Sequence, residues 1–214
     1  MFEFGAKMMV KPPRMLRRIY AGALWKVQTK EKKLFLTFDD GPIPEVTPWV
    51  LDVLKQYEAK ATFFCIGNNI AQYPQVFQAI INQGHVVGNH TFDHLNGWDT
   101  QKEIYMQNTE QCQSYFAEAY NLKLFRPPYG KMRFSQYNAL KRRYKVVLWD
   151  VLSMDYDANL SAEEVLNNVV ENATNGSIIV FHDSLKAEAH LRFVLPKVLQ
   201  YYSEKGFTFA PLCD

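Results

Sequence analysis

Residues 34–42 of the 214-residue chain read Leu-Phe-Leu-Thr-Phe-Asp-Asp-Gly-Pro, an apolar run that ends in two adjacent carboxylates and a turn. The aromatic and aliphatic residues at 34–38 predict a buried strand. Asp39 and Asp40 then stand at the end of that strand, where two carboxylates are costly unless a metal or another cation lies nearby. Asp-Gly-Pro is also ordinary turn chemistry, so this stretch alone is open to a purely structural role as well.

Downstream of this stretch, short β-rich runs alternate with segments of helical length. The alternation predicts a parallel α/β fold with seven strands, either barrel-like or doubly wound. Gly84, Gly176 and Gly206 each follow a helical segment, where a helix terminator is expected, and Ser161 followed by acidic residues is typical of a helix start. The predicted strands are 34–38, 61–66, 85–89, 122–125, 145–148, 177–181 and 207–210, and the predicted helices are 47–58, 71–83, 100–120, 135–143, 162–173 and 191–205.

Unusual polar residues follow five of these strands. In α/β folds the carboxyl ends of the strands carry the functional residues. After residues 39–40 the stretches are 90–94 (His-Thr-Phe-Asp-His), 126–130 (Arg-Pro-Pro-Tyr-Gly), 149–157 (Trp-Asp-Val-Leu-Ser-Met-Asp-Tyr-Asp) and 182–183 (His-Asp). We therefore expect these side chains to gather at one end of the sheet.

His90 and His94 are spaced for metal binding if the segment forms a helical turn, because both rings then point the same way. Such a pair also occurs as surface or core histidines. Together with one of the two aspartates they would make a three-ligand site with positions left for water and substrate.

The order of these motifs resembles the polysaccharide deacetylases, that is, the NodB homology domain or carbohydrate esterase family four. The stretches that carry the resemblance are 37–42 (Thr-Phe-Asp-Asp-Gly-Pro), 90–94, 126–129, Asp155-Tyr156 and 178–182 (Ile-Ile-Val-Phe-His). The resemblance covers residues 33–212. It implies a single-domain α/β fold, a distorted (β/α)7 barrel of NodB type, over residues 34–214.

The resemblance also implies a role for each matching residue. A divalent metal would be bound by Asp40, His90 and His94. Asp39 would be the general base that takes a proton from the attacking water, and Arg126 would pair with it.

On the other side of the reaction centre, His182 would be the general acid that protonates the leaving amine, with Asp155 hydrogen-bonded to it. The backbone N–H of Tyr129 would help to stabilise the oxyanion. Zinc is the expected ion, since histidine ligands with a carboxylate suit it best, and cobalt, manganese or iron are the alternatives.

The implied substrate pocket contains Tyr156, Val180 and Pro128, and two of these depart from the family pattern. The family usually has tryptophan where this chain has Tyr156, and leucine where it has Val180. Neither change touches a catalytic group, so we expect activity with an altered choice of substrate.

The net charge of +2 hides an uneven distribution. Residues 1–33 hold nine Lys/Arg against two acidic residues, whereas residues 34–214 hold fifteen Lys/Arg against twenty. This basic N-terminal arm is expected either to pack across the bottom of the barrel or, through residues 7–33, to make weak contact with anionic lipid. Nucleic-acid binding is not expected, because the rest of the chain is mildly acidic.

The expected compartment is the cytoplasm. The odd cysteine count (Cys65, Cys112 and Cys213) and the absence of a signal peptide or membrane-spanning run favour reduced thiols, with a possible peripheral position at the inner membrane.

The predicted function is a metal-dependent hydrolase that removes N-acetyl groups from amino-sugar units of a poly- or oligosaccharide. The alternatives are a deformylase or deacetylase of a lipid-linked sugar at the inner membrane face, and a catalytically idle sugar-binding domain.

Overall fold

Strand β1 (Lys33–Asp39) forms the centre of the fold in the computed structural model, which describes residues 10–116 and 123–212. Phe38 of this strand stacks between Phe63 and Phe181, with ring centroids 5.0 and 5.9 Å apart. Because the strand is buried along nearly its whole length, the apolar run recognised in the sequence becomes the middle of the core.

The sheet around β1 is parallel throughout and follows the order β5-β4-β3-β2-β1-β7-β6. Its strands are β2 (Thr62–Cys65), β3 (Val86–Asn89), β4 (Leu124–Phe125), β5 (Lys145–Val146), β6 (Val151–Leu152) and β7 (Ile178–His182). The sheet curls, but within the described ranges no strand pairing joins β5 to β6. The barrel is therefore open on that side and forms a half-barrel. The predicted single-domain, distorted (β/α)7 barrel is confirmed in this form.

One predicted strand forms outside the main path of the sheet, and one strand of the main path is not among those predicted. The predicted strand 207–210 is β8 (Thr208–Phe209), which lies off the main path and pairs only with Lys33 and Leu34 at the beginning of β1. The seventh place in the sheet belongs instead to β6, which has two residues and was too short to be recognised in the sequence.

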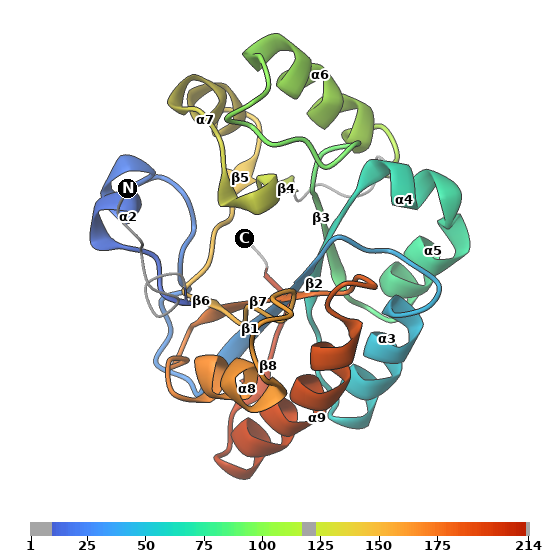
Figure 1. Cartoon of the computed structure of the whole chain (residues 1–214), viewed down its shortest axis with the longest axis vertical. Coiled ribbons are helices and arrows are strands. Elements are labelled where there is room, and N and C mark those ends of the chain that lie inside the picture. The colour runs from blue at the N-terminus through green and yellow to red at the C-terminus, as the bar shows by residue number, and fades with distance from the viewer. Residues whose placement is uncertain (1–9, 117–122, 213–214) are drawn as a thin grey trace.

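The helices lie round the outside of the curved sheet (Figure 1). They are α2 (Arg14–Ile19), α3 (Thr47–Gln56), α4 (Gly67–Gln72), α5 (Pro74–Asn82), α6 (Lys102–Gln113), α7 (Phe134–Leu140), α8 (Ala162–Val170) and α9 (Glu188–Glu204). The single helix predicted over 71–83 is divided at Tyr73, because Pro74 cannot continue a helix and instead begins α5. Residues 117–120 of the predicted helix 100–120, and residue 122 of the next predicted strand, lie outside the described residues.

Local signals in the sequence end and begin helices as expected, except at Gly176. Gly84 and Gly206 directly follow the C-caps of α5 and α9 and have φ of 75° and 76°, the left-handed conformation that ends a helix. Gly176 has φ of 78° as well, but it ends no helix: α8 ends at Val170, and Gly176 lies in the turn before β7. Ser161 caps α8, where its side chain accepts the Glu164 N–H while the Glu164 carboxylate accepts the Ser161 N–H.

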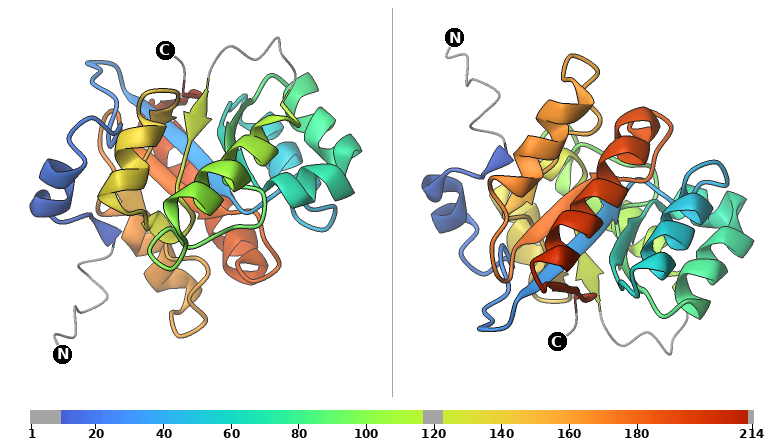
Figure 2. Two further views of the ribbon diagram at one scale, coloured as in Figure 1. Left: turned by 90° about the horizontal axis from the view of Figure 1, so that it is seen from above. Right: turned by 90° about the horizontal axis from the view of Figure 1, so that it is seen from below.

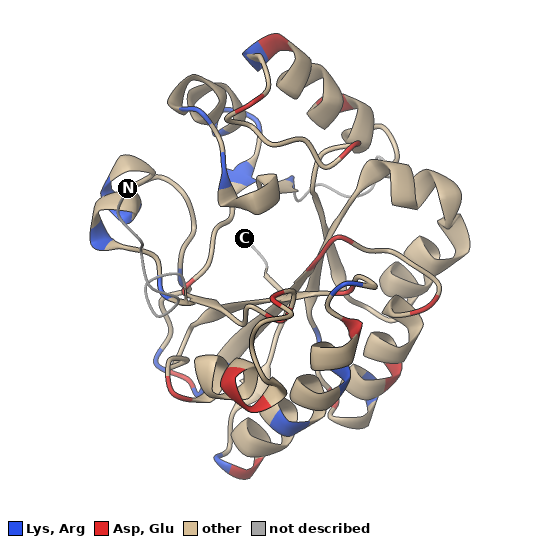
Figure 3. Cartoon of the chain, viewed as in Figure 1, with Lys and Arg blue, Asp and Glu red and all other residues tan. Residues whose placement is uncertain are grey.

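The basic arm packs against the barrel. Leu24 forms a parallel bridge with Val147 after β5, and the Val27 N–H donates to the Gly176 carbonyl before β7 (2.9 Å). Tyr20 and Trp25 are buried. Helix α2 itself lies at the edge of the molecule (Figures 1 and 2) and carries basic but no acidic residues (Figure 3).

Three cations of the arm meet a single carboxylate. This carboxylate belongs to Asp150, whose side chain is only 3% exposed. Its cationic partners are Arg17 Nη2 at 2.7 Å, Lys11 Nζ at 3.3 Å and Lys26 Nζ at 3.7 Å. The Ser177 hydroxyl donates a further hydrogen bond of 2.6 Å.

No helix within residues 10–116 and 123–212 is both long and apolar enough to cross a lipid bilayer.

Candidate active site

The Asp39 carboxylate at the end of β1 forms a buried ion pair with Arg126, which follows β4. Arg126 Nη1 lies 2.6 Å from Asp39 Oδ1, and the two side chains are 1% and 7% exposed. Arg126 is held by further bonds to Thr37 Oγ1 (2.8 Å) and the Leu148 carbonyl (3.1 Å). Its guanidinium also lies over the Phe64 ring, at 4.1 Å from the centroid. The structure therefore brings together the two residues expected to pair, and Asp39 is fixed in orientation.

Asp40, His90 and His94 converge beside this pair. One ligand atom from each lies within 4.8 Å of the other two. Asp40 Oδ1 is 3.2 Å from His94 Nε2 and 3.6 Å from His90 Nε2. Tetrahedral ligands about 2.1 Å from a zinc ion lie roughly 3.4 Å apart, so the spacing fits such an ion.

The protonation of two of these groups suits metal binding. Burial lowers the pKa of His90 to about 4, and its Nδ1 lies 2.8 Å from the Arg126 carbonyl, which accepts the Nδ1 proton and leaves the Nε2 lone pair toward Asp40. Burial would raise the pKa of Asp40, but the His94 hydrogen bond and the positive charge of His182 hold it below its usual range. A neutral imidazole beside an ionised carboxylate is the donor set that binds a divalent metal.

The loop that carries both histidines is held by asparagines, which sequence reasoning did not identify. The Asn108 side chain of α6 accepts the N–H groups of Phe92 (2.8 Å) and Asp93 (3.0 Å) and donates to the Asp93 carboxylate (2.6 Å). Asn89 accepts the Thr91 N–H (2.9 Å). The burial of Asn108, which makes polar partners necessary, is visible only in the structure, so the sequence carried no signal for this role.

His182, the last residue of β7, lies against Asp155. His182 Nδ1 is 2.7 Å from Asp155 Oδ1, and the His182 N–H donates to Asp155 Oδ2 at 2.9 Å. Burial would lower the pKa of His182, but the charge of Asp155 and its hydrogen bond, with Asp40 and Asp39 farther off, raise it to about 9. The imidazole is therefore protonated at neutral pH.

Tyr129 lies in a short 3₁₀ turn (Pro128–Gly130) after Arg126. Its φ is 59°, and its ring is 60% exposed and 4.6 Å from the His94 ring. The turn thus places the Tyr129 ring beside His94.

The expected pocket residues differ in exposure. The Tyr156 ring meets the His182 ring edge-on at 4.9 Å. Val180 is 1% exposed and belongs to the main hydrophobic core, and Pro128 is buried as well.

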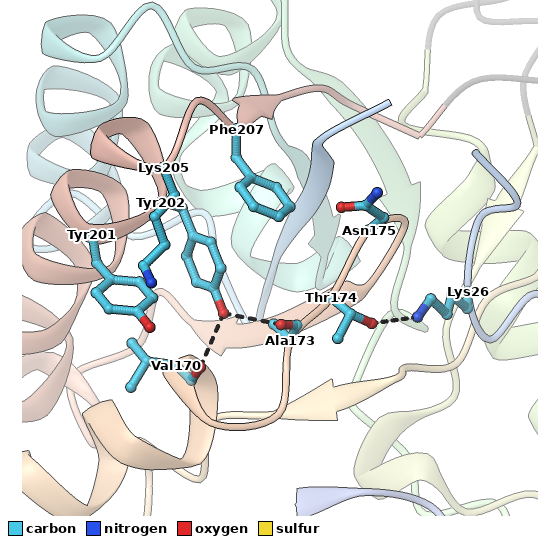
Figure 4. A pocket seen from close by; sticks show the side chains of 9 residues that line it. All are labelled: Lys26, Val170, Ala173, Thr174, Asn175, Tyr201, Tyr202, Lys205 and Phe207. Atoms are coloured by element: carbon cyan, nitrogen blue, oxygen red, sulfur yellow. Dashed lines mark hydrogen bonds between the residues drawn. The ribbon is translucent and has the colours of Figure 1, made fainter. Parts of the chain in front are cut away.

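A surface pocket of about 550 Å³ lies elsewhere, near the beginnings of β7 and β8 (Figure 4). Its lining includes Lys26, Asn175, Tyr201 and Phe207 and contains none of the predicted site residues. The reactive groups are therefore concentrated at the opposite, carboxyl ends of the strands.

Two of the three cysteines stand apart from the chemistry. Cys65 and Cys112 are free and buried, and burial raises the pKa of both thiols, that of Cys112 to about 12. Cys213 lies outside the described residues.

A parallel α/β barrel in which one aspartate and two histidines could hold a metal ion, beside a second carboxylate and a protonated histidine, is an arrangement suited to metal-assisted hydrolysis. Comparison with known proteins identifies the family. The model of the polysaccharide deacetylase family matches residues 26–145. The chain belongs to this family.

Its relatives include a peptidoglycan-N-acetylglucosamine deacetylase of Bacillus cereus, 34% identical over 89% of this chain and 91% of the relative. A chitooligosaccharide deacetylase of Azorhizobium caulinodans is 31% identical over 89% of this chain and 98% of the relative. A crystal structure of a peptidoglycan N-acetylglucosamine deacetylase, Bc1960, superposes with a TM-score of 0.82 at 33% identity, over 89% of this chain and 91% of that one.

The fold alone does not distinguish active from inactive members. A family-four pseudoenzyme from Bacillus anthracis shares the fold with a TM-score of 0.76 at 21% identity, over 88% of this chain and 66% of that one. Activity must therefore be argued from the side chains.

Proposed function

We propose that this protein is a metal-dependent hydrolase that removes N-acetyl groups from amino-sugar units of a poly- or oligosaccharide. The observation that carries the proposal is the convergence of Asp40, His90 and His94 within 4.8 Å. The peptidoglycan and chitooligosaccharide deacetylases among its relatives support this substrate class.

The metal would be held by Asp40, His90 and His94. When bound, a divalent cation lowers the pKa of a water molecule and polarises the amide carbonyl. Zinc suits the two histidines and one carboxylate best, with cobalt, manganese or iron as alternatives. Metal analysis tests the ligand set: Asp40→Ala should lose the ion, and full retention would contradict the assignment.

Asp39 is the proposed general base. Its carboxylate accepts the proton of the attacking water, and the bond from Arg126 at 2.6 Å fixes the direction in which its lone pairs point. Arg126 also supplies the countercharge of this buried carboxylate.

His182 is the proposed general acid. An amine leaves poorly unless it is protonated, and a histidine with a pKa of about 9 carries the required proton at neutral pH. Asp155 holds the ring through Nδ1, which leaves Nε2 to donate to the leaving nitrogen. The backbone N–H of Tyr129 is the proposed hydrogen-bond donor to the carbonyl oxygen as negative charge develops.

The proposed acyl pocket contains Tyr156, Val180 and Pro128. Tyr156 lies beside His182, so the smaller ring with its hydroxyl would change which acyl group fits next to the acid.

Acetate release tests the activity. Wild-type protein reloaded with zinc or cobalt after chelation should release acetate from chito-oligosaccharides or peptidoglycan fragments, and Asp39→Asn should not. If wild type and Asp39→Asn both release none, the alternative of a catalytically idle sugar-binding domain is favoured. Intact Asp39 and His182 argue against that alternative, because a binding domain needs neither an acid nor a base.

A second candidate function is a deformylase or deacetylase of a lipid-linked sugar, with weak contact to an anionic membrane. The outer side of α2 favours it: Met15 is 71% and Ile19 45% exposed, beside the exposed cations Arg14 and Arg18. Flotation with phosphatidylglycerol vesicles tests the contact. Binding should be lost in Arg14→Glu/Arg18→Glu and retained in Lys30→Glu, and equal binding of the two variants would refute this surface.

The cellular compartment is part of the same proposal. We place the protein in the cytoplasm, with the weak contact at the inner face of the inner membrane; the two free buried cysteines agree with a reducing compartment. Cell fractionation tests it: recovery on the extracytoplasmic side of the inner membrane would exclude a lipid-linked substrate on the inner face.

A further inference from the structure

Asp183, which directly follows His182, is a buried residue that the proposed chemistry does not use. It is 0% exposed. Its Oδ1 accepts the Gly41 N–H at 3.0 Å, and its Oδ2 accepts the Thr47 hydroxyl at 2.6 Å. Its own N–H donates to the Asp39 carbonyl at 3.0 Å. One residue at the end of β7 therefore bonds to both sides of Asp40.

Asp40 needs such support because its backbone is in an unfavourable conformation. Its φ is 81°, in the left-handed region that residues other than glycine rarely adopt. A conformation of this kind persists only where the surroundings determine it. The turn is also fixed by Asn69 Nδ2, which donates to the Asp40 carbonyl (2.7 Å), and by the Ile66 N–H, which donates to the Gly41 carbonyl (2.9 Å).

Gly41 and Asp183 fit each other closely. A Cβ atom added at Gly41 would overlap the Asp183 carboxylate, so this glycine is required for room. Thr47, at the start of α3, extends the contact: its oxygen accepts the Ile43 N–H (2.9 Å) while its proton goes to Asp183. The turn 39–43 is thus joined to β7 and α3 through one carboxylate.

We propose that Asp183 is a positioning residue for the metal site: it holds Asp40 in the left-handed conformation that aims the Asp40 carboxylate at His90 and His94. The proposal rests on the proposed function only in taking Asp40 as a metal ligand. Asp183 does not touch the reacting atoms and acts through the backbone of the turn.

The test is metal affinity, measured without substrate. Asp183→Asn keeps the shape but replaces one of the two acceptor oxygens with an amide donor, so the Gly41 N–H and the Thr47 hydroxyl proton no longer each have an acceptor. Thr47→Val removes the hydroxyl and leaves Asp183 in place. Both variants should bind zinc and cobalt about 10- to 100-fold more weakly than wild type, the usual effect of losing a group that orients a ligand. Asp52→Asn, which changes an exposed carboxylate on α3 in the same way, should bind like wild type.

Two further measurements separate positioning from folding. The visible spectrum of bound cobalt should change in Asp183→Asn, because Asp40 meets the ion at a different angle, and the Gly41 N–H should exchange faster in metal-free protein. Thermal unfolding of each metal-free variant shows whether it is folded. If Asp183→Asn does not fold, Thr47→Val decides.

Wild-type affinity together with an unchanged cobalt spectrum in a folded Thr47→Val or Asp183→Asn variant would overturn the proposal. Weaker metal binding in these variants, with no acetate release from wild type, would instead uphold the positioning role and reject the proposed function. Retention of metal by Asp40→Ala would remove Asp40 as a ligand and overturn both.

Discussion

At the scale of single residues, the site combines buried charges with partners that fix them. Asp39 and Arg126 are nearly inaccessible to solvent, and each supplies the countercharge of the other. Such a pair gives little net stability, but removing one partner leaves an uncompensated buried charge.

Arg126→Gln is therefore expected to lower the free energy of unfolding by about 3–5 kcal/mol, since Asp39 is left buried without a cation. Urea denaturation of the metal-free protein measures this loss. The double variant Asp39→Asn/Arg126→Gln removes both charges and should be more stable than Arg126→Gln alone. Equal stability of the two would show that the unpaired charge is not the cause.

His85, which precedes β3 and is 3% exposed, makes the stability of the fold depend on pH. Burial, with a smaller effect of Lys60, lowers its pKa from 6.5 to about 4, and its Nδ1 accepts the Ala61 N–H at 3.1 Å. A proton on Nδ1 would displace that hydrogen bond, so the native state disfavours protonation.

Between pH 6.5 and pH 4 the unfolded chain binds a proton at His85 before the folded chain does, so stability must fall as the pH falls through this window. The loss of folding free energy caused by His85 reaches about 3 kcal/mol at pH 4 and is absent above pH 6.5. Chemical denaturation at several pH values measures it. His85→Asn, whose side-chain oxygen can accept the Ala61 N–H, should give a flatter profile, and a profile identical to wild type would rule out His85 as the origin.

At the scale of elements, short-range signals predicted the ends of helices well, because a capping hydroxyl or a left-handed glycine acts within a few residues. The same signals do not show what lies against the element. Gly176 and Gly206 look alike in sequence and have φ of 78° and 76°. A Cβ at Gly176 would overlap the Val27 carbonyl of the arm, whereas one at Gly206 would meet nothing within 4 Å.

This difference predicts unequal effects of one substitution. Gly206→Ala should cost roughly 1–2 kcal/mol, the penalty of the left-handed conformation alone. Gly176→Ala should cost clearly more, because it must also displace Val27 and its hydrogen bond to the Gly176 carbonyl. Thermal and urea unfolding of the two variants compare the costs. Similar losses would mean that the arm adjusts without penalty.

At the scale of the whole molecule, the motifs predicted the fold and the gathering of the site residues, because parallel strands bring their carboxyl ends together. The partners that hold the site could not be predicted in this way. Asp183 meets Gly41 across 142 positions of sequence, and Asn108 reaches the histidine loop from a helix. These contacts depend on packing between elements, which spacing along the chain does not encode.

The arm shows the same limit. Its excess of positive charge was visible in the sequence, but three of its cations converge on Asp150, which burial alone would make costly to ionise. The hydrogen bonds from Ser177 and Arg17 and the charges of Lys11 and Lys26 outweigh burial and lower the pKa of Asp150. Part of the basic charge therefore serves attachment within the molecule.

Asp150→Asn is predicted to loosen residues 10–27 from the barrel. The amide cannot neutralise Arg17, Lys11 and Lys26, which would then repel one another, so the arm should become accessible to trypsin at these basic residues while the remaining barrel resists cleavage. Limited proteolysis with mass spectrometry locates the cuts. Arg17→Gln, which removes the cation closest to Asp150, should have a smaller effect in the same direction at Lys26. Lys30→Gln, at an exposed position, removes its own cleavage site but should leave cleavage at Arg17 and Lys26 as in wild type. If Asp150→Asn shows the wild-type cleavage pattern and stability, apolar packing of Tyr20 and Trp25 is sufficient to hold the arm.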